Sequence, residues 1–274
     1  MLINCKGQLI DLSTPKVMGV MNVTPDSFFD GGKYKNEYEI VTRAGKILTE
    51  GATFIDIGAY STRPGAEFVP EQEEIARIVP AIEIILKHFP ETLLSIDTFR
   101  AEVANASIES GAAIINDIAA GGLDDKMFDV IAKYNVPYIM MHMRGNPQTM
   151  QTMTEYDDIV KEMLFYFSEK VAKARSLGIN DLILDPGFGF AKTTEQNYEV
   201  LQKMELFNVL ELPVLAGISR KSMIYKTLNI TAQEALNGTT VINTIALTKG
   251  AKILRVHDVK EAMECVTLFN KMSL

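Results

Sequence analysis

The feature that most constrains the fold of this chain is a regular alternation of short apolar runs with longer amphipathic stretches. The runs are rich in β-branched residues and bounded by turn residues, which is typical of buried parallel strands. They lie at Val17–Met21, Phe54–Ile57, Leu93–Ile96, Ala113–Asn116, Tyr138–Met141, Leu182–Leu184, Val214–Ala216 and Ile253–Val256.

The stretches between these runs carry apolar residues at helical spacing. In Glu71–His88, for example, Ile75, Ile78 and Ile82 recur every three or four residues behind Pro70, a residue suited to a helix start. The predicted helices are Glu37–Glu50, Glu71–His88, Ala101–Ser110, Asp124–Tyr134, Asp157–Leu177, Thr194–Met204, Thr231–Lys249 and Val259–Lys271.

Uninterrupted strand–helix alternation over 274 residues predicts an α/β protein with one closed (β/α)8 TIM barrel. No linker, low-complexity tract or internal repeat divides the chain, so we expect residues 1–274 to form a single domain. A doubly wound open sheet is the alternative that the pattern leaves open.

The composition argues against several classes of function. With 27 Lys+Arg against 35 Asp+Glu, the net charge of −8 disfavours a broad nucleic-acid or membrane surface. No apolar run approaches the roughly 18–20 residues that span a bilayer. Because the N-terminus lacks a signal-peptide pattern, we expect a cytoplasmic protein. Its two cysteines, Cys5 and Cys265, are then expected to be buried thiols rather than a disulfide or metal framework.

Polar residues collect where the predicted strands end. In a barrel these positions converge on one face, where active sites are built. They are Asn22, Asp56, Asp97, Asn116, Asp117, His142, Asp185, the segment Ser219–Ser222, Arg255 and His257. Any one of them can instead cap the following helix. Helix capping alone, however, does not account for polar residues of both charge signs at the ends of all eight strands.

The charges of this set suggest what it binds. The acidic members are Asp56, Asp97, Asp117 and Asp185, and the basic ones are Arg63, Arg220, Lys221 and Arg255, with His257 beside them. Carboxylate and amide side chains suit a donor-rich aminopyrimidine edge, whereas Arg and His suit a phosphate or pyrophosphate. A ring of surface salt bridges is the alternative interpretation of the basic residues.

Three loops look specialised. The loop from Asn22 to Gly32 carries Phe28 and Phe29 in a Gly/Pro-rich segment, which suggests a lid over an aromatic ring, or else an ordinary rim loop. The loop Ser61–Ala66 holds Arg63 in a stiff turn. Gly217–Ser222 leads into a helix whose start suits a carboxylate or phosphate, although it lacks the P-loop spacing.

Taken together, these segments resemble the dihydropteroate synthase family. The matching stretches, in order along nearly the whole chain, are 18–28 (MGVMNVTPDSF), 61–66 (STRPGA), 95–98 (SIDT), 115–117 (IND), 141–147 (MHMRGNP), 184–190 (LDPGFGF), 217–222 (GISRKS) and 255–258 (RVHD). The resemblance implies a TIM barrel, usually a homodimer, that is a target of sulfonamides. It also implies a Mg²⁺-dependent condensation of 6-hydroxymethyl-7,8-dihydropterin pyrophosphate with 4-aminobenzoate, giving 7,8-dihydropteroate and pyrophosphate in folate synthesis.

The same resemblance implies roles for individual residues. The pterin is expected to contact Asp97, Asn116, Asp185, Lys221, Arg255 and Met140. Arg63, Arg255 and His257 are implied to hold the pyrophosphate, and Asn22 the Mg²⁺. The residues implied to hold 4-aminobenzoate are Phe28, Thr62, Pro64, Phe190, Lys221 and Ser222. Asp97, Lys221, Arg63 and His257 are implied to be catalytic, in a dissociative reaction.

One departure from the family pattern is Tyr60, which stands where many members carry an acidic residue, so contacts of the following loop are in question. His142 belongs to a family motif but receives no chemical role. Two other functions remain open at this stage: a methyltetrahydrofolate methyltransferase of the same superfamily, and a pterin-binding paralogue without activity.

Overall fold

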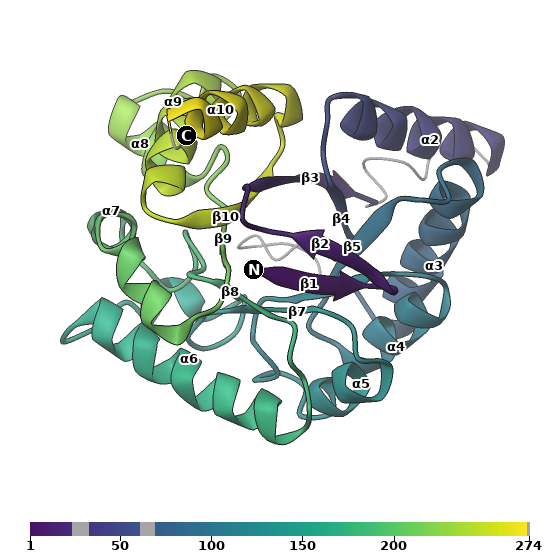
Figure 1. Ribbon diagram of the computed structural model, residues 1–274, viewed down its shortest axis with the longest axis horizontal. Helices are drawn as coiled ribbons and strands as arrows, with labels where there is room; N and C mark the ends of the chain where they lie inside the picture. The colour runs from purple at the N-terminus through teal and green to yellow at the C-terminus, as the bar shows by residue number, and fades with distance from the viewer. Residues whose placement is uncertain (24–32, 61–68, 273–274) are drawn as a thin grey trace.

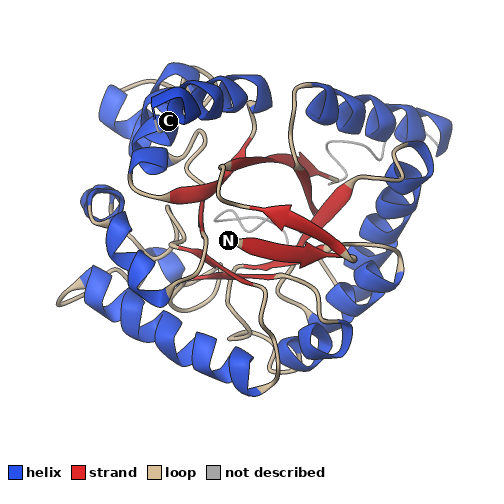
Figure 2. Cartoon of the chain, in the orientation of Figure 1, coloured by secondary structure: helices blue, strands red, loops and turns tan. Residues whose placement is uncertain are grey.

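The computed structural model describes residues 1–23, 33–60 and 69–272 of the chain. Eight parallel strands close into a barrel in the order β10-β3-β4-β5-β6-β7-β8-β9 (Figure 2). Their bounds are β3 Lys16–Asn22, β4 Phe54–Gly58, β5 Leu93–Asp97, β6 Ile114–Asp117, β7 Tyr138–Met141, β8 Leu182–Asp185, β9 Val214–Ala216 and β10 Ala251–Val256. Each strand coincides with one predicted apolar run to within two residues at either end, so the TIM-barrel prediction is confirmed and the open sheet is excluded.

Helices surround the barrel in sequence order (Figure 1). The α-helices are α2 Lys33–Thr49, α3 Glu71–His88, α4 Ala101–Glu109, α5 Met127–Tyr134, α6 Ile159–Ser176, α7 Thr194–Gln202, α8 Ser222–Leu228, α9 Leu236–Thr248 and α10 Val259–Met272. Among the described residues, two 3₁₀ segments, Met150–Thr152 and Met204–Leu210, lie in the connections. None of the helices in the described ranges is long and apolar enough to cross a bilayer.

The predicted helix Thr231–Lys249 is wrong at its start, because α9 begins only at Leu236. Glu234 accepts hydrogen bonds from both the backbone N–H and the hydroxyl of Thr231, which forms a turn there. The guanidinium of Arg220 binds the carbonyl oxygens of Ala232 and Gln233, two groups that a helix would need for its first turn.

Alternation along the strands sorts their side chains into an inner and an outer set. At the amino ends, each strand contributes one buried apolar residue to an inner floor layer: Met18, Phe54, Leu93, Ile114, Ile139, Ile183, Leu215 and Ile253. Two residues further along each strand, the next inner positions are Val20, Asp56, Ser95, Asn116, Met141, Asp185, Gly217 and Arg255. The barrel interior is therefore dry and apolar at one end and polar toward the carboxyl ends of its strands.

An N-terminal hairpin, which the sequence analysis did not predict, covers the apolar floor. Its strands β1 Leu2–Cys5 and β2 Gln8–Asp11 pair antiparallel across a two-residue turn at Lys6 and Gly7, both with positive φ. Ile3, Cys5, Ile10 and Leu12 are buried in one cluster with the floor layer. Figure 1 shows the hairpin lying across the opening of the barrel.

Candidate active site

Asp56 is the centre of a buried hydrogen-bond network inside the barrel. Its Oδ1 accepts from the hydroxyl of Ser95 at 2.6 Å. Its Oδ2 accepts from Asn116 Nδ2 at 3.2 Å and from Arg255 Nε at 2.6 Å. Asp56 is fully buried, so these bonds to three neighbouring or opposing strands hold Asn116 and Arg255 in fixed orientations. From the sequence, Asp56 is one of the acidic residues at the strand ends, but no substrate or catalytic role is predicted for it.

Asp97 accepts a second hydrogen bond from the Arg255 guanidinium. Arg255 Nη2 donates to Asp97 Oδ2 at 2.7 Å, so the guanidinium bridges Asp56 and Asp97. Burial raises the pKa of Asp97 to about 7, with Arg255 opposing and Asp56 adding to the rise. Although burial lowers the pKa of Arg255, the two carboxylates raise it above its ordinary value, so the guanidinium remains charged.

Asp185 and Lys221 form the other side of this site. Burial raises the pKa of Asp185, while Lys221 and a hydrogen bond from the Gly187 N–H at 2.7 Å oppose the rise. Lys221 Nζ donates to the Phe188 carbonyl and lies 4.7 Å from the centroid of the Phe190 ring. Burial lowers the pKa of Lys221 to about 8, against the opposing effect of Asp185. Ser222 begins α8 directly after Lys221.

His257 follows β10 and lies against Ser219. The distance between Ser219 Oγ and His257 Nδ1 is 3.1 Å, and the His257 N–H donates to the same hydroxyl at 3.2 Å. Arg220, in contrast, was wrongly grouped with the site. Its guanidinium forms a bidentate pair with Asp258, at 2.8 and 2.9 Å, besides its bonds to the loop before α9. For Arg220 the salt-bridge interpretation is the correct one.

Two predicted positions point away from the barrel interior. Met140 pairs in register with Asp117 and Leu184, and paired residues share a face of the sheet. Asp117 accepts from the Tyr138 hydroxyl at 2.7 Å and from two backbone N–H groups of the loop after β6. Met140 is buried in the core cluster that includes helix residues such as Phe167. The prediction that Met140 lines the pterin site is therefore wrong, and the inner face belongs to Met141.

Other predicted site residues fall outside the described ranges. These are Phe28, in the first loop, and Thr62, Arg63 and Pro64, in the second. Of the remaining ones, Asn22 ends β3 on the inner side, where its Oδ1 lies 3.6 Å from the point that a Cβ on Gly58 would occupy. The Cβ and one carboxylate oxygen of Asp97 lie at 3.6 and 3.8 Å from the same point, so Asn22 and Asp97 are close neighbours.

Tyr60, the departure from the family pattern, packs against an arginine. Its ring makes an edge contact with Phe99 at 5.6 Å between centroids, and the Arg100 guanidinium lies 5.3 Å from its centroid. Arg100 also binds the buried carboxylate of Glu74 at 2.7 Å. Helix α3 therefore supplies a carboxylate partner for Arg100, while Tyr60 supplies an aromatic face.

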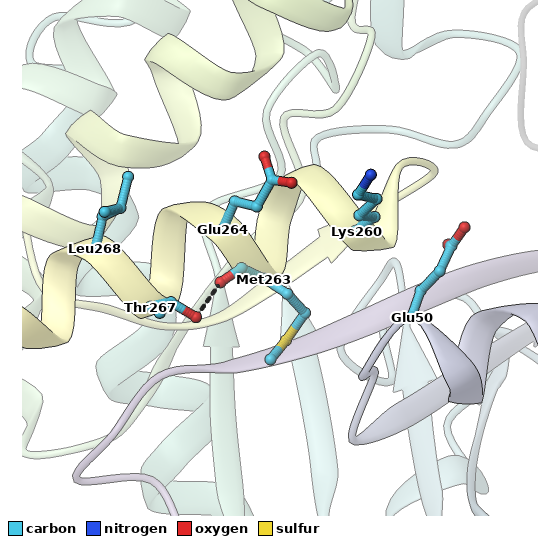
Figure 3. Close-up of a pocket in the computed structure, with 6 residues that line it drawn as sticks. All are labelled: Glu50, Lys260, Met263, Glu264, Thr267 and Leu268. Atoms are coloured by element: carbon cyan, nitrogen blue, oxygen red, sulfur yellow. Dashed lines mark hydrogen bonds between the residues drawn. The ribbon is translucent and has the colours of Figure 1, made fainter.

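Two surface hollows lie among the described residues, and the second includes His142, which directly follows the end of β7. One is formed by α10 and the end of α2, around Met263, Thr267 and Glu50 (Figure 3). The other runs along α6 and includes Arg144 and Phe165. Neither hollow is lined by the residues of the network around Asp56.

Comparisons with known proteins agree with this geometry. The family model described as "Pterin binding enzyme" matches residues 18–257. The dihydropteroate synthase of Escherichia coli K12 is 44% identical over 263 residues, covering 95% of this chain and 93% of that protein.

Solved structures agree as well. A Yersinia pestis dihydropteroate synthase in complex with a sulfonamide drug has a TM-score of 0.93 and 41% identity, covering 100% of this chain and 99% of that one. The Xanthomonas albilineans enzyme with 4-aminobenzoic acid has a TM-score of 0.91 and 37% identity, covering 99% and 98%.

The barrel and the matched family model define a pterin-binding enzyme. Within that family the chain belongs to the dihydropteroate synthases, which are transferases of folate biosynthesis. Identity above 40% over almost the full length of both chains separates it from the methyltetrahydrofolate methyltransferases, the other pterin-binding enzymes considered from the sequence.

Proposed function

We propose that this chain condenses 6-hydroxymethyl-7,8-dihydropterin pyrophosphate with 4-aminobenzoate, using the inner residues at the carboxyl end of the barrel. The observation that carries the proposal is the convergence of Asp97, Asn116, Asp185 and Arg255 from four separate strands. Asp56 and Arg255 join Asn116 and Asp97 by hydrogen bonds, and Asp185 Oδ2 and Arg255 Cδ lie 3.8 and 3.9 Å from the point that a Cβ on Gly217 would occupy. A structural role alone does not require two carboxylates and an arginine inside a barrel, because burying charges costs several kcal/mol per ion.

The pterin is assigned to Asp97, Asn116 and Asp185. Its aminopyrimidine ring presents N–H donors and a carbonyl acceptor, and the two carboxyl groups accept from such donors. Asn116 already donates one amide hydrogen to Asp56, which directs its carbonyl oxygen and its second hydrogen elsewhere. The planar guanidinium of Arg255 is fixed by ion pairs from its Nε to Asp56 and from its Nη2 to Asp97. One face of the guanidinium is therefore positioned to stack on the pterin ring.

The pyrophosphate is assigned to Arg63, Arg255 and His257, with Mg²⁺ beside Asn22. In the described ranges, no group of three or more His, Cys, Asp or Glu residues is arranged to hold a metal ion. A single amide oxygen next to the Asp97 carboxylate nevertheless fits Mg²⁺, which keeps most of its waters and takes phosphate oxygens as ligands. Bound there, the ion would supply positive charge to the leaving pyrophosphate.

The second substrate is assigned to Lys221, Ser222 and Phe190, with Thr62, Pro64 and Phe28 from the two loops. Lys221 and the start of α8 offer a cation and backbone N–H groups to the carboxylate of 4-aminobenzoate. The Phe190 ring, beside the Lys221 ammonium, offers an apolar face to the aromatic ring.

We propose a dissociative reaction. The C–O bond between the pterin methylene and pyrophosphate breaks first, and its electron pair leaves with the pyrophosphate, whose charge Arg63 and His257 offset. The methylene cation is stabilised by donation from the pterin ring and by the negative charge of Asp97. The aminobenzoate nitrogen then donates its lone pair to form the C–N bond and loses one proton to solvent water. No covalent bond to the protein forms.

We also propose that the chain works as a single-domain homodimer in the cytoplasm. Exposed apolar side chains on the adjacent helices α9 and α10 support self-association: Val241, Ile245, Leu268 and Met272. Two free, buried cysteines suit a reducing compartment. Light scattering tests the dimer: we expect twice the chain mass, falling to the monomer mass in Leu268→Glu.

The activity itself is tested with purified protein, both substrates and Mg²⁺, by following radiolabelled 4-aminobenzoate into dihydropteroate. We expect product to depend on all three components. Pterin binding without any product, at micromolar protein, would instead identify a non-catalytic binder, and sulfonamides should compete with 4-aminobenzoate if its site is assigned correctly.

A further inference from the structure

Lys192 is a buried lysine that none of the roles above uses. It follows the Gly-rich segment after β8, and its side chain is only 6% exposed. Burial lowers its pKa to about 7, with Asp185 opposing and Lys221 and Arg144 reinforcing that effect. Burying a charged ammonium costs desolvation free energy, so a buried lysine needs specific hydrogen-bond partners.

Four acceptor atoms lie within 3.5 Å of the Lys192 ammonium. Its Nζ lies 3.1 Å from His142 Nδ1, 3.0 Å from the Gly187 carbonyl, 3.0 Å from the Phe190 carbonyl and 3.5 Å from the His142 carbonyl. An ammonium has three N–H donors and no acceptor, so each of the three nearest partners can take one donor. A neutral amine would leave one of these partners without a donor. The arrangement therefore suits the charged form.

His142 is held as a neutral acceptor. Burial, with help from Lys192, lowers the pKa of His142 well below its ordinary value. Its ring is enclosed by aromatic rings, with Tyr166 in edge contact at 5.0 Å between centroids. A neutral imidazole that accepts at Nδ1 carries its proton on Nε2, and so His142 serves here as a fixed anchor for Lys192.

The two loops that Lys192 joins lie in direct backbone contact. The His142 N–H donates to the Asp185 carbonyl at 2.9 Å. Gly187 has a φ of +67°, and a Cβ at this position would lie 2.2 Å from the His142 carbonyl oxygen. The Gly187 N–H also binds Asp185 Oδ1, so the geometry of this turn is linked to that of the Asp185 carboxylate.

The same loop contacts Lys221. The Phe188 carbonyl accepts from Lys221 Nζ, and the Phe190 ring lies beside that ammonium. A Cβ on Gly189 would come within 3.3 Å of Lys221 Cδ. The carbonyls of Gly187 and Phe190, which flank Phe188 by one and two residues, are the ones that Lys192 holds.

We propose that Lys192, anchored on His142, is a positioning residue that sets the place of Lys221 in the active site by holding the Gly187–Phe190 backbone. Lys192 is not assigned a catalytic role, because its Nζ is held by an imidazole nitrogen and by backbone carbonyl groups. The proposal rests on the assignment of Lys221 to the substrates.

Kinetics of Lys192→Met, Lys221→Ala and the double variant test the proposal, because residues acting through one another are not additive. We expect Lys192→Met to lower kcat/KM for 4-aminobenzoate by roughly 10- to 100-fold, and Lys221→Ala by roughly 100-fold or more. The double variant should resemble Lys221→Ala within about threefold, since Lys192 acts through a group that is already absent. A double variant that multiplies the two losses would overturn the proposal, as would wild-type kinetics for Lys192→Met.

The anchor supplies a second test that does not depend on Lys192→Met folding. His142→Asn keeps an acceptor near the position of Nδ1, whereas His142→Leu removes it. We therefore expect the His142→Asn variant to retain most of the activity and the His142→Leu variant to lose it. Equal kinetics for the two would overturn the proposed anchor. Lys170→Met is the matched control, because Lys170 is a half-buried lysine that lies 5.5 Å from the Tyr166 ring, outside the site, and should leave kcat/KM unchanged.

Circular dichroism and the melting temperature of each variant separate positioning from folding. If Lys192→Met melts below the assay temperature, the comparison of His142→Asn with His142→Leu replaces it. If Lys221→Ala itself has wild-type kinetics, the proposed active site fails. If Lys221→Ala is impaired and Lys192→Met is not, only the positioning role fails.

Discussion

Replacing Asp97 by Asn is expected to make the protein more stable while removing most of its activity. The pKa of Asp97 is about 7 in the folded protein, against an ordinary value of 3.8. Each pH unit of such a difference corresponds to about 1.4 kcal/mol, so ionising Asp97 costs the folded state at most about 4 kcal/mol. An amide of the same shape avoids this cost, and Arg255 keeps its bond to Asp56.

The sign of the effect gives it a characteristic pH dependence. A carboxyl whose folded pKa is raised loses stability as pH rises from about 4 to about 7, because only the unfolded chain ionises readily in that range. The Asn variant should therefore melt up to about 8 °C above the wild type at pH 8, taking about 2 °C per kcal/mol for a chain of this size. The difference should shrink toward zero as pH approaches 4.

Activity should move in the opposite direction. Loss of the negative charge that faces the pterin cation is expected to lower kcat by roughly 100-fold or more, or about 3 kcal/mol. Calorimetry across pH and steady-state kinetics measure the two effects, with Asp125→Asn, an exposed carboxylate on the surface, as the charge-matched control. A melting temperature that falls, or one that rises equally at pH 4 and pH 8, would refute the reasoning; wild-type kcat would refute the catalytic role.

Four further outcomes are expected. Lys221→Ala should lower turnover roughly 100-fold or more with an unchanged circular dichroism spectrum, because one charge-stabilising contact is worth several kcal/mol; a loss under threefold would contradict it. Phe28→Ala, in the first loop, should raise KM for 4-aminobenzoate much more than the pterin Kd, and equal losses would contradict a lid over the second substrate. The kcat/KM profile should rise through about pH 7, as Asp97 ionises, and fall through about pH 8, as Lys221 loses its proton; a flat profile between pH 6 and 9 would count against both roles. Chelation by EDTA should abolish turnover reversibly, with Mg²⁺ but not Na⁺ restoring it, and activity that survives EDTA would exclude a required divalent ion.

The barrel and the location of the site were predictable because both follow from simple periodicity. Continuous apolar runs mark buried strands, and polar residues at their ends mark the functional face. The floor of eight apolar side chains and the polar layer two residues further along are the direct result of this pattern.

The incorrect predictions at the strand ends arose because it was not known which side chains face the inside of the barrel. Met140 and Met141 have the same side chain, and Asn116 and Asp117 are both short polar residues, yet neighbouring residues of a strand face opposite sides. Counting from Ile139, which is in the apolar floor, puts Met141 on the inner face and Met140 on the outer one. The signal was thus present in the sequence but needed a strand register to be used.

Other features needed three-dimensional contacts. Lys192 and His142 are 50 residues apart and meet only because β7 and β8 are neighbours in the barrel. The late start of α9 depends on a guanidinium from the loop after β9. The hairpin, by contrast, had a local signal, a Lys6-Gly7 turn between two short alternating segments.

The hairpin has a practical consequence for attaching this protein to a surface. Met1 is half exposed and directly precedes β1, which lies across the amino ends of the barrel strands, whereas Asp97, Asp185 and Lys221 lie at the other end. An affinity handle fused before Met1 would therefore orient the molecule with its proposed substrate site toward the solution. Immobilised in that way, it is suited to biosensor measurements of candidate ligands, with no coupling chemistry near the proposed site.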